Sequence, residues 1–225
     1  CQHLRREKMD LAYGPKYENI REEVRAFAAE HGHLAPSPTA EEKERVPWQR
    51  LLLQKGYAGR NIPKIYGGYG AELDILENRV IEEEFIRSGI PLGLANQGIS
   101  MLVPTLLDLG TERQRLELIP GTLSGDIIWC QGYSEPGAGS DLAALQTSAV
   151  EDGDDFIING QKIWTSSAHY ADMIFCLVRT EPGAAKHAGI SYLLFSMRTP
   201  GIEVRPLITA TGRGEFNEVF FTDVR

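Results

Sequence analysis

The chain has 225 residues, of which 42% are hydrophobic, and this suits one or two globular domains with a buried core. Its formal net charge of −8 argues against a nucleic-acid partner. No apolar run is long enough to span a bilayer, and the charged start, Cys1 to Asp10, lacks the apolar core of a signal peptide. We therefore expect an intracellular, cytoplasmic protein.

The cysteines and histidines do not form a metal-binding pattern. Cysteines at positions 1, 130 and 176 have no paired short spacing, which argues against a disulfide framework or a zinc site. Cys130 and Cys176 are expected to be small buried hydrophobic residues. Histidines at positions 3, 31, 33, 169 and 187 include no pair at helical metal-ligand spacing. The sequence therefore predicts no metal site.

The first third of the chain predicts three helices. Apolar residues from Tyr17 to Ala28 recur at three- and four-residue steps, which indicates an amphipathic helix ending near Gly32. A second helical run from Glu41 contains Pro47, so it is expected to start late or to kink there. A third helix is expected over 72–87. Its apolar residues are expected to be buried: Leu73, Leu76, Val80 and Phe85. Its acidic run is expected to be solvated: Glu82, Glu83 and Glu84.

Two further helices are expected before the residue pattern changes. The strongly apolar run from Pro91 to Leu109 predicts a buried central helix. Thr111, which is followed by charged residues, is a suitable N-cap for a short helix through Leu118.

From Ile127 onward, short β-prone runs alternate with turn residues at intervals typical of a compact sheet or barrel. These runs lie at 127–130, 147–150, 156–164, 173–179, 191–196, 204–207 and 219–221. Helices followed by strands indicate an α+β fold. We expect an all-α helical domain over 1–124, then a small antiparallel β-barrel or β-sandwich domain over 125–225.

The loop over 131–141, Gln-Gly-Tyr-Ser-Glu-Pro-Gly-Ala-Gly-Ser-Asp, has the composition of a ligand cradle. Gly137 and Gly139 let the backbone turn and approach a ligand without an intervening Cβ. Exposed backbone N–H groups and the hydroxyls of Ser134 and Ser140 can hydrogen-bond to carbonyl, ring-nitrogen or phosphate acceptors. Taken alone, such a loop is usually only a turn.

A β-hairpin is predicted at Asn159-Gly160, because a type I′ turn needs positive φ at both central residues and the flanking runs are β-prone. Its return strand places Trp164, Thr165 and Ser166 together at its far end. An indole face can stack on a planar ring, and hydroxyls can bond to the heteroatoms of that ring. A single strand tryptophan is usually part of the core, so the loop and the strand end are informative mainly in combination.

Two other chemistries fit the loop less well. Ser140, Asp141 and His169 could form a hydrolase triad, but Ser140 lacks the Gly-x-Ser-x-Gly elbow that exposes a nucleophile. The loop also lacks the Lys-Ser/Thr ending of a phosphate loop and the Gly-x-Gly-x-x-Gly of a dinucleotide fold. A hydrolase and a nicotinamide-binding Rossmann domain are therefore disfavoured.

Ser-Glu-Pro-Gly-Ala-Gly-Ser-Asp over 134–141 and Asn-Gly-Gln-Lys-Ile-Trp-Thr-Ser over 159–166 closely resemble the flavin-binding signature of the acyl-CoA dehydrogenase family. The likeness extends from Tyr17 to Arg225. The resemblance implies FAD as cofactor and the α,β-desaturation of a fatty or related acyl-CoA to the trans-2-enoyl-CoA. It also implies an electron-transfer flavoprotein as electron acceptor, and a homo- or heterotetramer that serves lipid catabolism.

The resemblance assigns roles within the loop. Gln131 and Ser134 match positions that meet the flavin pyrimidine edge, and Gly139 belongs to the same cofactor-binding loop. Ser140 matches a contact to the CoA arm of the substrate. Many family members have an aromatic residue in place of Gln131 and threonine in place of Ser134.

At the strand end, Trp164 matches the indole beside the isoalloxazine ring. Where many members have Trp-Ile-Thr, this chain has Trp164, Thr165 and Ser166. Both hydroxyls are candidate cofactor contacts, and the register favours Ser166 at flavin N5.

No catalytic residue is expected within 1–225. Family members continue past the position of Arg225 into a helical bundle that carries the catalytic carboxylate. Glu135 lies in the signature loop, but Pro136 pushes it toward extended geometry, and it is expected to anchor backbone N–H groups.

The run over 214–221 resembles a bacterial branch that often handles bulky, sterol-like or xenobiotic acyl-CoAs. Two alternatives stay open: a non-catalytic partner subunit of a heteromeric acyl-CoA dehydrogenase, and a flavin oxidase or monooxygenase on the same fold.

Overall fold

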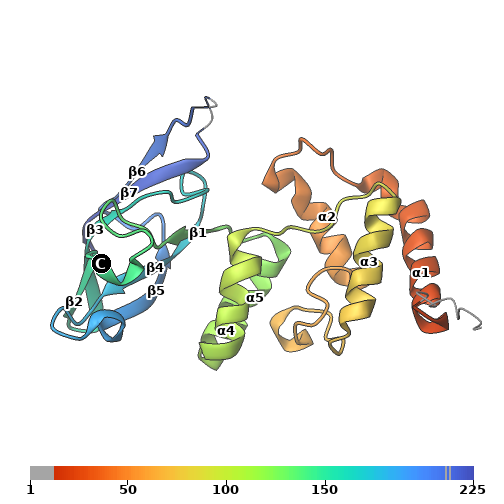
Figure 1. Ribbon diagram of the computed structural model, residues 1–225, viewed down its shortest axis with the longest axis horizontal. Helices are drawn as coiled ribbons and strands as arrows, with labels where there is room; N and C mark the ends of the chain where they lie inside the picture. The colour runs from red at the N-terminus through yellow and green to blue at the C-terminus, as the bar shows by residue number, and fades with distance from the viewer. Residues whose placement is uncertain (1–12, 211, 213) are drawn as a thin grey trace, which may run out of the picture. The chain divides into compact units, whose positions relative to one another are not determined.

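The computed structural model describes residues 13–210, 212 and 214–225. The charged run from Cys1 to Asp10, which includes His3, lies outside the described residues. The chain divides into two compact units, Cys1–Leu94 and Ala95–Arg225, and each is described by itself (Figure 1). The domain boundary expected between residues 124 and 125 stays a prediction.

The described part of the first unit is helical. Its elements are α1 (Pro15–His31), α2 (Glu42–Lys55) and α3 (Ile75–Arg87), with 3-10 turns at Gly32–Leu34 and Lys64–Tyr66. α1 ends at His31, directly before Gly32, as predicted. α2 begins at Glu42 and continues through Pro47, so the late start is wrong, and the alternative of a kink at Pro47 stays a prediction. Pro47 is the sixth residue of α2, past the first turn, so it removes one hydrogen bond of the helix and crowds the carbonyl four residues earlier.

The core of this unit is an apolar and aromatic cluster contributed by α1, α2 and α3. Its buried members are Val24, Phe27, Trp48, Leu52, Ile81 and Phe85. Phe27 stacks on Phe85 with ring centroids 6.0 Å apart. The predicted burial of Val80 and Phe85 is confirmed.

α3 begins three residues later than predicted, because the Asp74 carboxylate caps it. Asp74 Oδ1 accepts the backbone N–H of Glu77 at 3.0 Å. This start leaves Leu73 and Leu76 exposed, so their predicted burial is wrong.

Glu84 is buried, against the expectation of a solvated acidic run. Its Oε1 accepts from Arg21 Nη1 and from Arg87 Nη1 at 2.7 Å each, and its Oε2 accepts from Arg25 Nε at 2.8 Å. The hydrogen bond from Arg25, followed by those from Arg21 and Arg87, lowers the pKa of Glu84 to about 2 despite its burial. The arginines come from two helices, so a pattern within one helix does not show this cluster.

The buried helix predicted over 91–109 is wrong for its first part, where the backbone is irregular up to Asn96. Side chains of α2 bond here to backbone groups that a helix would use for its own hydrogen bonds. Trp48 Nε1 donates to the Pro91 carbonyl at 2.9 Å, and Gln49 Oε1 accepts the Leu94 N–H at 2.8 Å.

The helices of the second unit follow a π-helical turn at Gly98–Leu102. They are α4 (Val103–Leu109) and α5 (Glu112–Ser124). Thr111 caps α5 as predicted, since its Oγ1 accepts the Gln114 N–H at 3.2 Å. α5 packs against the start of the sheet through a bond from Trp129 Nε1 to Thr122 Oγ1 at 2.9 Å.

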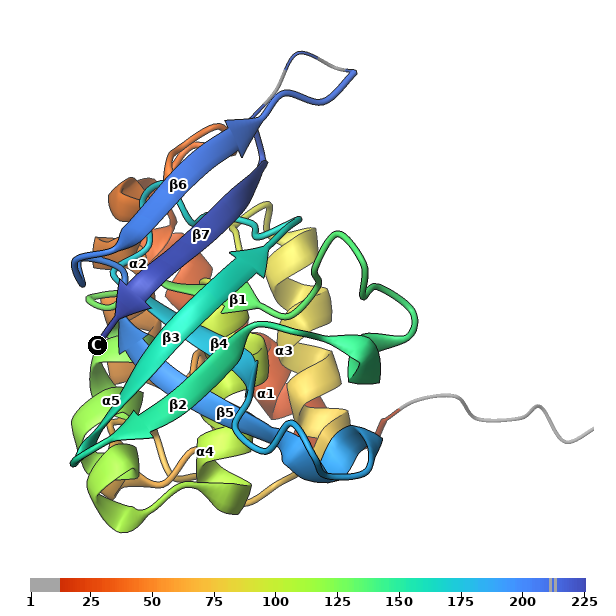
Figure 2. The same cartoon turned by 90° about the vertical axis from the view of Figure 1, so that its left-hand side faces the viewer.

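The sheet of this unit has seven strands in the order β1-β4-β2-β3-β7-β6, with β5 paired to β4 (Figure 2). Their bounds are β1 Trp129–Gly132, β2 Ser148–Asp152, β3 Asp155–Lys162, β4 Met173–Arg179, β5 Ile190–Ser196, β6 Ile202–Leu207 and β7 Phe216–Val224. The α+β class is confirmed. β4 pairs parallel with β1 and β2 and the remaining pairs are antiparallel, so the sheet is mixed rather than purely antiparallel.

The hairpin predicted at Asn159-Gly160 is wrong. β2 and β3 are joined at Gly153-Asp154, where Gly153 has a φ of 67° and Asp152 pairs with Asp155. Gly153 therefore supplies the positive φ that the connection needs.

Gly160 instead serves the interior of β3. The pairing of β3 with β7 shifts register between Ile158 and Gly160. A Cβ on Gly160 would lie 2.6 Å from Thr147 Cα, and the φ of Gly160 is 150°. Close backbone approach, rather than a reverse turn, requires the glycine.

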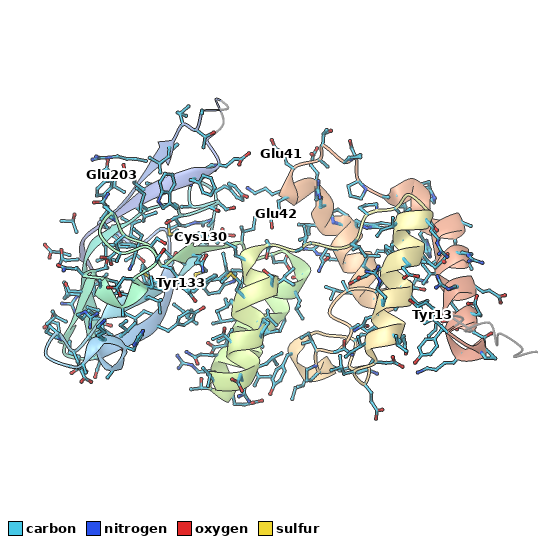
Figure 3. The ribbon with its side chains drawn as sticks, in the orientation of Figure 1. Tyr13, Glu41, Glu42, Cys130, Tyr133 and Glu203 are labelled. Atoms are coloured by element: carbon cyan, nitrogen blue, oxygen red, sulfur yellow. The ribbon has the colours of Figure 1, made fainter. Side chains whose placement is uncertain are left out.

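The interior of the sheet is apolar. Its buried members are Cys130, Ala149, Ile158, Ala168, Ile174, Cys176, Val178, Val219, Phe221 and Val224. Cys130, labelled in Figure 3, and Cys176 are free and buried as predicted. Burial raises the pKa of the Cys176 thiol to about 12, so this sulfur behaves as a small hydrophobic group.

Candidate functional site

The loop that follows β1 closes a tight turn with its glycines exposed. Backbone hydrogen bonds run both ways between Glu135 and Ala138, at 2.9 and 3.0 Å. Gly137 and Gly139 are exposed, and a Cβ built on either would meet nothing within 4 Å. A planar or phosphate-bearing ligand can therefore approach this stretch of backbone closely.

Glu135 anchors the loop to the sheet, as predicted. Its Oε2 accepts the Gln146 N–H at 2.6 Å, and its Oε1 accepts the Thr147 N–H at 2.9 Å and a bond from Lys162 Nζ at 2.8 Å. Lys162 is fully buried and also donates to the Tyr133 carbonyl at 3.1 Å. Burial alone would raise the pKa of Glu135, but Lys162 and the two N–H groups hold it below its ordinary value.

No role was predicted for Lys162, although the sequence contains a signal for it. Side chains alternate between the faces of a strand, so Lys162 shares a face of β3 with the buried Ile158. A lysine at an inward strand position requires an acidic partner. The partner is Glu135, on the loop after β1.

The end of β3 lies directly against the same loop. The Ile163 N–H donates to the Ser134 carbonyl at 2.9 Å. The chain then reaches Trp164, whose φ of 60° is in the left-handed region and whose side chain is 59% exposed. The structure therefore brings the predicted loop and the predicted strand end together around one hydrogen bond.

The two hydroxyl residues after Trp164 differ in accessibility. Thr165 is fully buried, and its Oγ1 has no hydrogen-bond partner among the described residues. Ser166 is half-buried. Phe216 supports Trp164 from β7, with the ring centroids 5.9 Å apart in an edge-to-face arrangement.

The remaining predicted contacts lie on the loop and on β1. Gln131 is half-buried in β1, and its Oε1 accepts from Gln97 Nε2 at 3.5 Å. Ser134 is half-buried and Ser140 is exposed. Contact of any of these residues with a cofactor or substrate stays a prediction.

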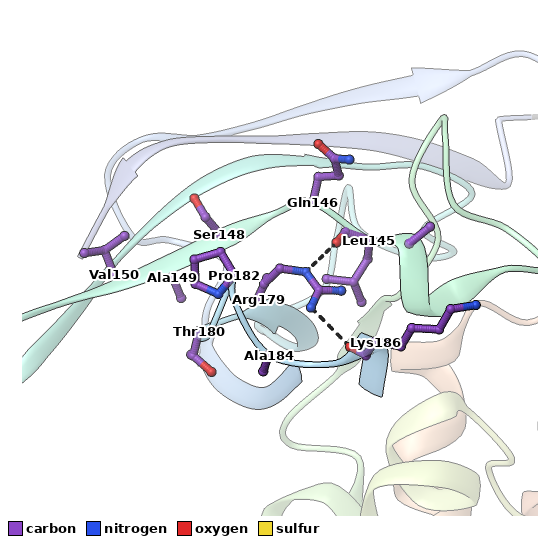
Figure 4. Close-up of a pocket in the computed structure, with 11 residues that line it drawn as sticks. Leu145, Gln146, Ser148, Ala149, Val150, Arg179, Thr180, Pro182, Ala184 and Lys186 are labelled. Atoms are coloured by element: carbon purple, nitrogen blue, oxygen red, sulfur yellow. Dashed lines mark hydrogen bonds between the residues drawn. The ribbon is translucent and has the colours of Figure 1, made fainter. Parts of the chain in front are cut away.

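A hollow of about 530 Å³ lies beside residues 144–150, which follow the loop over 131–141 (Figure 4). Residues that line it are Leu145, Gln146, Ser148, Arg179, Thr180 and Lys186. The Arg179 guanidinium donates to the carbonyls of Ala143, Leu145 and Lys186, so it braces the wall of the hollow. Lys186 also lines the hollow, and its side chain points away from Arg179 (Figure 4).

The part of the chain that the structure describes supports neither a metal site nor a membrane-spanning helix. No three His, Cys, Asp or Glu side chains gather there in a group that could hold a metal ion. None of its helices combines the length and the apolar character needed to cross a membrane.

Comparisons with known proteins match nearly the whole chain. Residues 14–126 match the family model of the acyl-CoA dehydrogenase N-terminal domain, and residues 130–224 match that of the acyl-CoA dehydrogenase middle domain. The acyl-CoA dehydrogenase IpdE1 of Mycobacterium tuberculosis is 44% identical over 200 residues, which are 88% of this chain and 51% of that protein.

Two solved structures extend this likeness to the fold. The Tcur3481-Tcur3483 steroid ACAD has a TM-score of 0.75 at 36% identity and covers 96% of this chain and 56% of that one. The ChsE4-ChsE5 complex from Mycobacterium tuberculosis has a TM-score of 0.73 at 34% identity, with the same two coverages. The chain thus spans about half the length of these relatives. It belongs to the acyl-CoA dehydrogenase family.

Proposed function

We propose that the protein to which this chain belongs is an FAD-dependent oxidoreductase that desaturates an acyl-CoA thioester to the trans-2-enoyl-CoA. The observation that carries the proposal is the exposed Trp164 indole, held in left-handed backbone geometry beside the loop that the Glu135–Lys162 pair anchors. An exposed aromatic face beside open glycines fits a planar ring. When bound, FAD would supply the acceptor for the hydride that leaves the substrate β-carbon.

The residues present fit this cofactor. Trp164 is the proposed stacking partner of the ring, and Gln131 and Ser134 are the proposed contacts to its pyrimidine edge. Ser166 is the proposed hydroxyl donor to N5, because it is accessible whereas the Thr165 hydroxyl is buried. Thr165 remains a proposed residue of the cofactor site, between Trp164 and Ser166 in the chain.

Gly139 and Ser140 continue the proposed site toward the substrate. Gly139 gives the cofactor close access to the loop backbone, since no Cβ intervenes. Ser140 is the proposed contact to the CoA arm, and its side chain is exposed.

The base that removes the substrate α-proton is proposed to come from outside residues 1–225. Glu135 is the buried carboxylate of the loop, and its bonds to Lys162 and to the N–H groups of Gln146 and Thr147 hold its pKa below the ordinary value. A general base must reach the proton that it takes, and a buried carboxylate held in its charged form is poorly suited to this role.

An absorbance spectrum of the complete, purified protein tests the proposal. We expect flavin bands that bleach when an acyl-CoA substrate is added without oxygen. Trp164→Ala should lower flavin occupancy and shift the flavin bands, because a lost stacking contact is worth about 0.5–1.5 kcal/mol beyond area. Trp164→Phe keeps an aromatic face and should keep most of the flavin. A protein without flavin, or unchanged occupancy and bands in Trp164→Ala, would contradict this placement.

For substrate and partners, we propose a bulky, sterol-like acyl-CoA, an electron-transfer flavoprotein as acceptor and a tetrameric assembly. Support comes from the similar steroid ACAD and from the ChsE4-ChsE5 complex, whose name gives two different components. The same observation favours a second candidate, a non-catalytic partner subunit of such a complex. Bleaching by acyl-CoA when the protein is purified alone supports the enzyme, whereas bleaching only with a co-expressed second subunit supports the partner. Rapid reoxidation of the reduced protein by oxygen would indicate an oxidase.

A further inference from the structure

The turn that carries Trp164 has a backbone that its residues disfavour. Trp164 has a φ of 60° and Ser167 a φ of 65°, and neither is a glycine. A side chain in the left-handed region crowds its own backbone, so such residues persist only where surrounding contacts hold them. The contacts that hold the turn therefore determine where the indole lies.

Asn217, in β7, makes the central contacts to this turn. The Thr165 N–H donates to the Asn217 carbonyl at 3.0 Å, and the Asn217 N–H donates to the Thr165 carbonyl at 3.0 Å. Asn217 Nδ2 donates to the same Thr165 carbonyl at 2.8 Å. Thr165, between the exposed indole and the accessible Ser166 hydroxyl, is thus held on both its N–H and its carbonyl.

The side chain of Asn217 adds something that backbone pairing does not need. It is fully buried, and burial of an amide is unfavourable unless its hydrogen bonds are made. Its Nδ2 is used by Thr165 and lies 3.3 Å from His169 Nδ1, whereas its Oδ1 has no partner among the described residues. The described contacts of this amide are therefore directed at the turn and at the His169 ring beside it.

Asn159 provides the comparison within the same pair of strands. It links β3 to β7 at the opposite end, where its Nδ2 donates to Asp223 Oδ1 at 3.0 Å and its Oδ1 accepts the Asp223 N–H at 2.9 Å. Asn159 is exposed and lies in β3, away from the turn in sequence. Asn159 joins β3 to β7, whereas Asn217 joins β7 to the turn that follows β3 and bears Trp164.

We infer that Asn217 is a positioning residue for the cofactor: its amide holds the Thr165 peptide and so determines where the Trp164 indole and the Ser166 hydroxyl lie. Phe216, the preceding residue, supports the indole edge-on. The expected effect on cofactor binding rests on the proposed function, but the position of the indole can be measured without a cofactor.

The test compares Asn217→Leu with Asn159→Leu in the complete protein labelled with 5-fluorotryptophan. The Trp164 fluorine resonance is assigned by its loss in Trp164→Phe. Trp164 is exposed, whereas Trp48 and Trp129 are buried. We expect Asn217→Leu to shift or broaden that resonance and to weaken FAD retention about tenfold, whereas Asn159→Leu changes neither; tenfold corresponds to about 1.4 kcal/mol. If Asn217→Leu does not fold, Asn217→Ser removes the same donor with a smaller polar side chain.

The outcomes separate the inference from the proposed function. An unmoved Trp164 resonance in a folded Asn217 variant overturns the inference, as does an equal shift in Asn159→Leu. A shifted resonance with unchanged FAD retention also overturns it, because the turn would then move without affecting the cofactor. If the wild-type protein carries no flavin and binds none, the proposed function fails, while the resonance still reports whether Asn217 holds the turn.

Discussion

Lys162→Met tests the anchor of the loop over 131–141 most directly. It replaces a fully buried ammonium, 2.8 Å from Glu135 Oε1 and 3.1 Å from the Tyr133 carbonyl oxygen, by an apolar side chain of similar length. Glu135 then keeps the backbone N–H donors of Gln146 and Thr147. Its charge remains in a buried place without an opposite charge.

The expected loss of stability follows from that uncompensated charge. Removing one member of a buried ion pair destabilises proteins by about 3–5 kcal/mol. Because two backbone donors to Glu135 remain, we expect the lower end, about 3 kcal/mol. The double variant Lys162→Met/Glu135→Gln leaves no buried charge and should lose less than Lys162→Met alone, about 1–2 kcal/mol from the missing hydrogen bonds.

The pH dependence gives a second signature of the same pair. In the wild-type protein the folded-state pKa of Glu135 is lowered, so its contribution is present above the unfolded pKa and is lost as pH falls through the folded pKa. In Lys162→Met, burial is no longer opposed by the ammonium, and the folded-state pKa should rise. Destabilisation by Lys162→Met should therefore shrink as the pH is lowered and Glu135 takes up a proton.

Urea unfolding of the complete protein, with hydrogen exchange of peptides covering 131–147, measures both effects. Lys16→Met is the control, because Lys16 pairs with Asp74 at the surface and such pairs contribute little. A Lys162→Met protein no less stable than Lys16→Met, or a double variant less stable than Lys162→Met, would refute the role of the buried ion pair.

Three further predictions follow from individual contacts. Ser140→Ala should raise the KM for CoA esters with little change in flavin content, since it removes a contact that binds substrate and transition state equally. Steady-state kinetics measure KM and absorbance measures flavin content, and an unchanged KM would contradict this role of Ser140. Glu135→Gln, if it folds and retains FAD, should still exchange the substrate α-proton with deuterated solvent, and mass spectrometry that finds no exchange would make Glu135 the base. Glu84→Gln should lower stability at neutral pH by about 1.5–3 kcal/mol, because its hydrogen bonds to arginine are charge-assisted. In the wild type this contribution should be lost as pH falls from about 4.5 toward about 2, so equal stabilities of the two proteins at pH 7 would refute it.

Residue periodicity and cap chemistry located most elements, because both act within a few residues. β4 spans Met173–Arg179 as the β-prone run predicts, and Thr111 caps α5 through its own hydroxyl. Contacts between elements were not accessible in this way. Glu84 looks like part of a solvated acidic run until Arg21 and Arg25 of α1 are placed against it.

The misplaced hairpin shows how a local signal can have more than one cause. Asn159-Gly160 has the composition of a type I′ turn, but Gly160 is required by the close approach of Thr147, and Asn159 bonds across to Asp223 on β7. Neither neighbour is visible from the dipeptide. Trp164, Thr165 and Ser166 still lie at the strand end, because that position depends on the length of β3 and not on where it turns.

The candidate site depends on a coupling that neither of its halves reveals. The loop alone is a turn with exposed glycines, and the strand end alone is an exposed tryptophan with a buried threonine. Lys162 and Glu135 lie 27 positions apart, yet their bond at 2.8 Å, together with the bond from Ile163 N–H to the Ser134 carbonyl, fixes the loop against β3. A buried charge pair is satisfied only at short distance and good geometry, so it penalises any displacement of the loop along the strand. The separation between Ser134 and Trp164 is therefore set by the pair and not by either motif, which is why we expect substitutions at Lys162 to affect both ends of the proposed cofactor site at once.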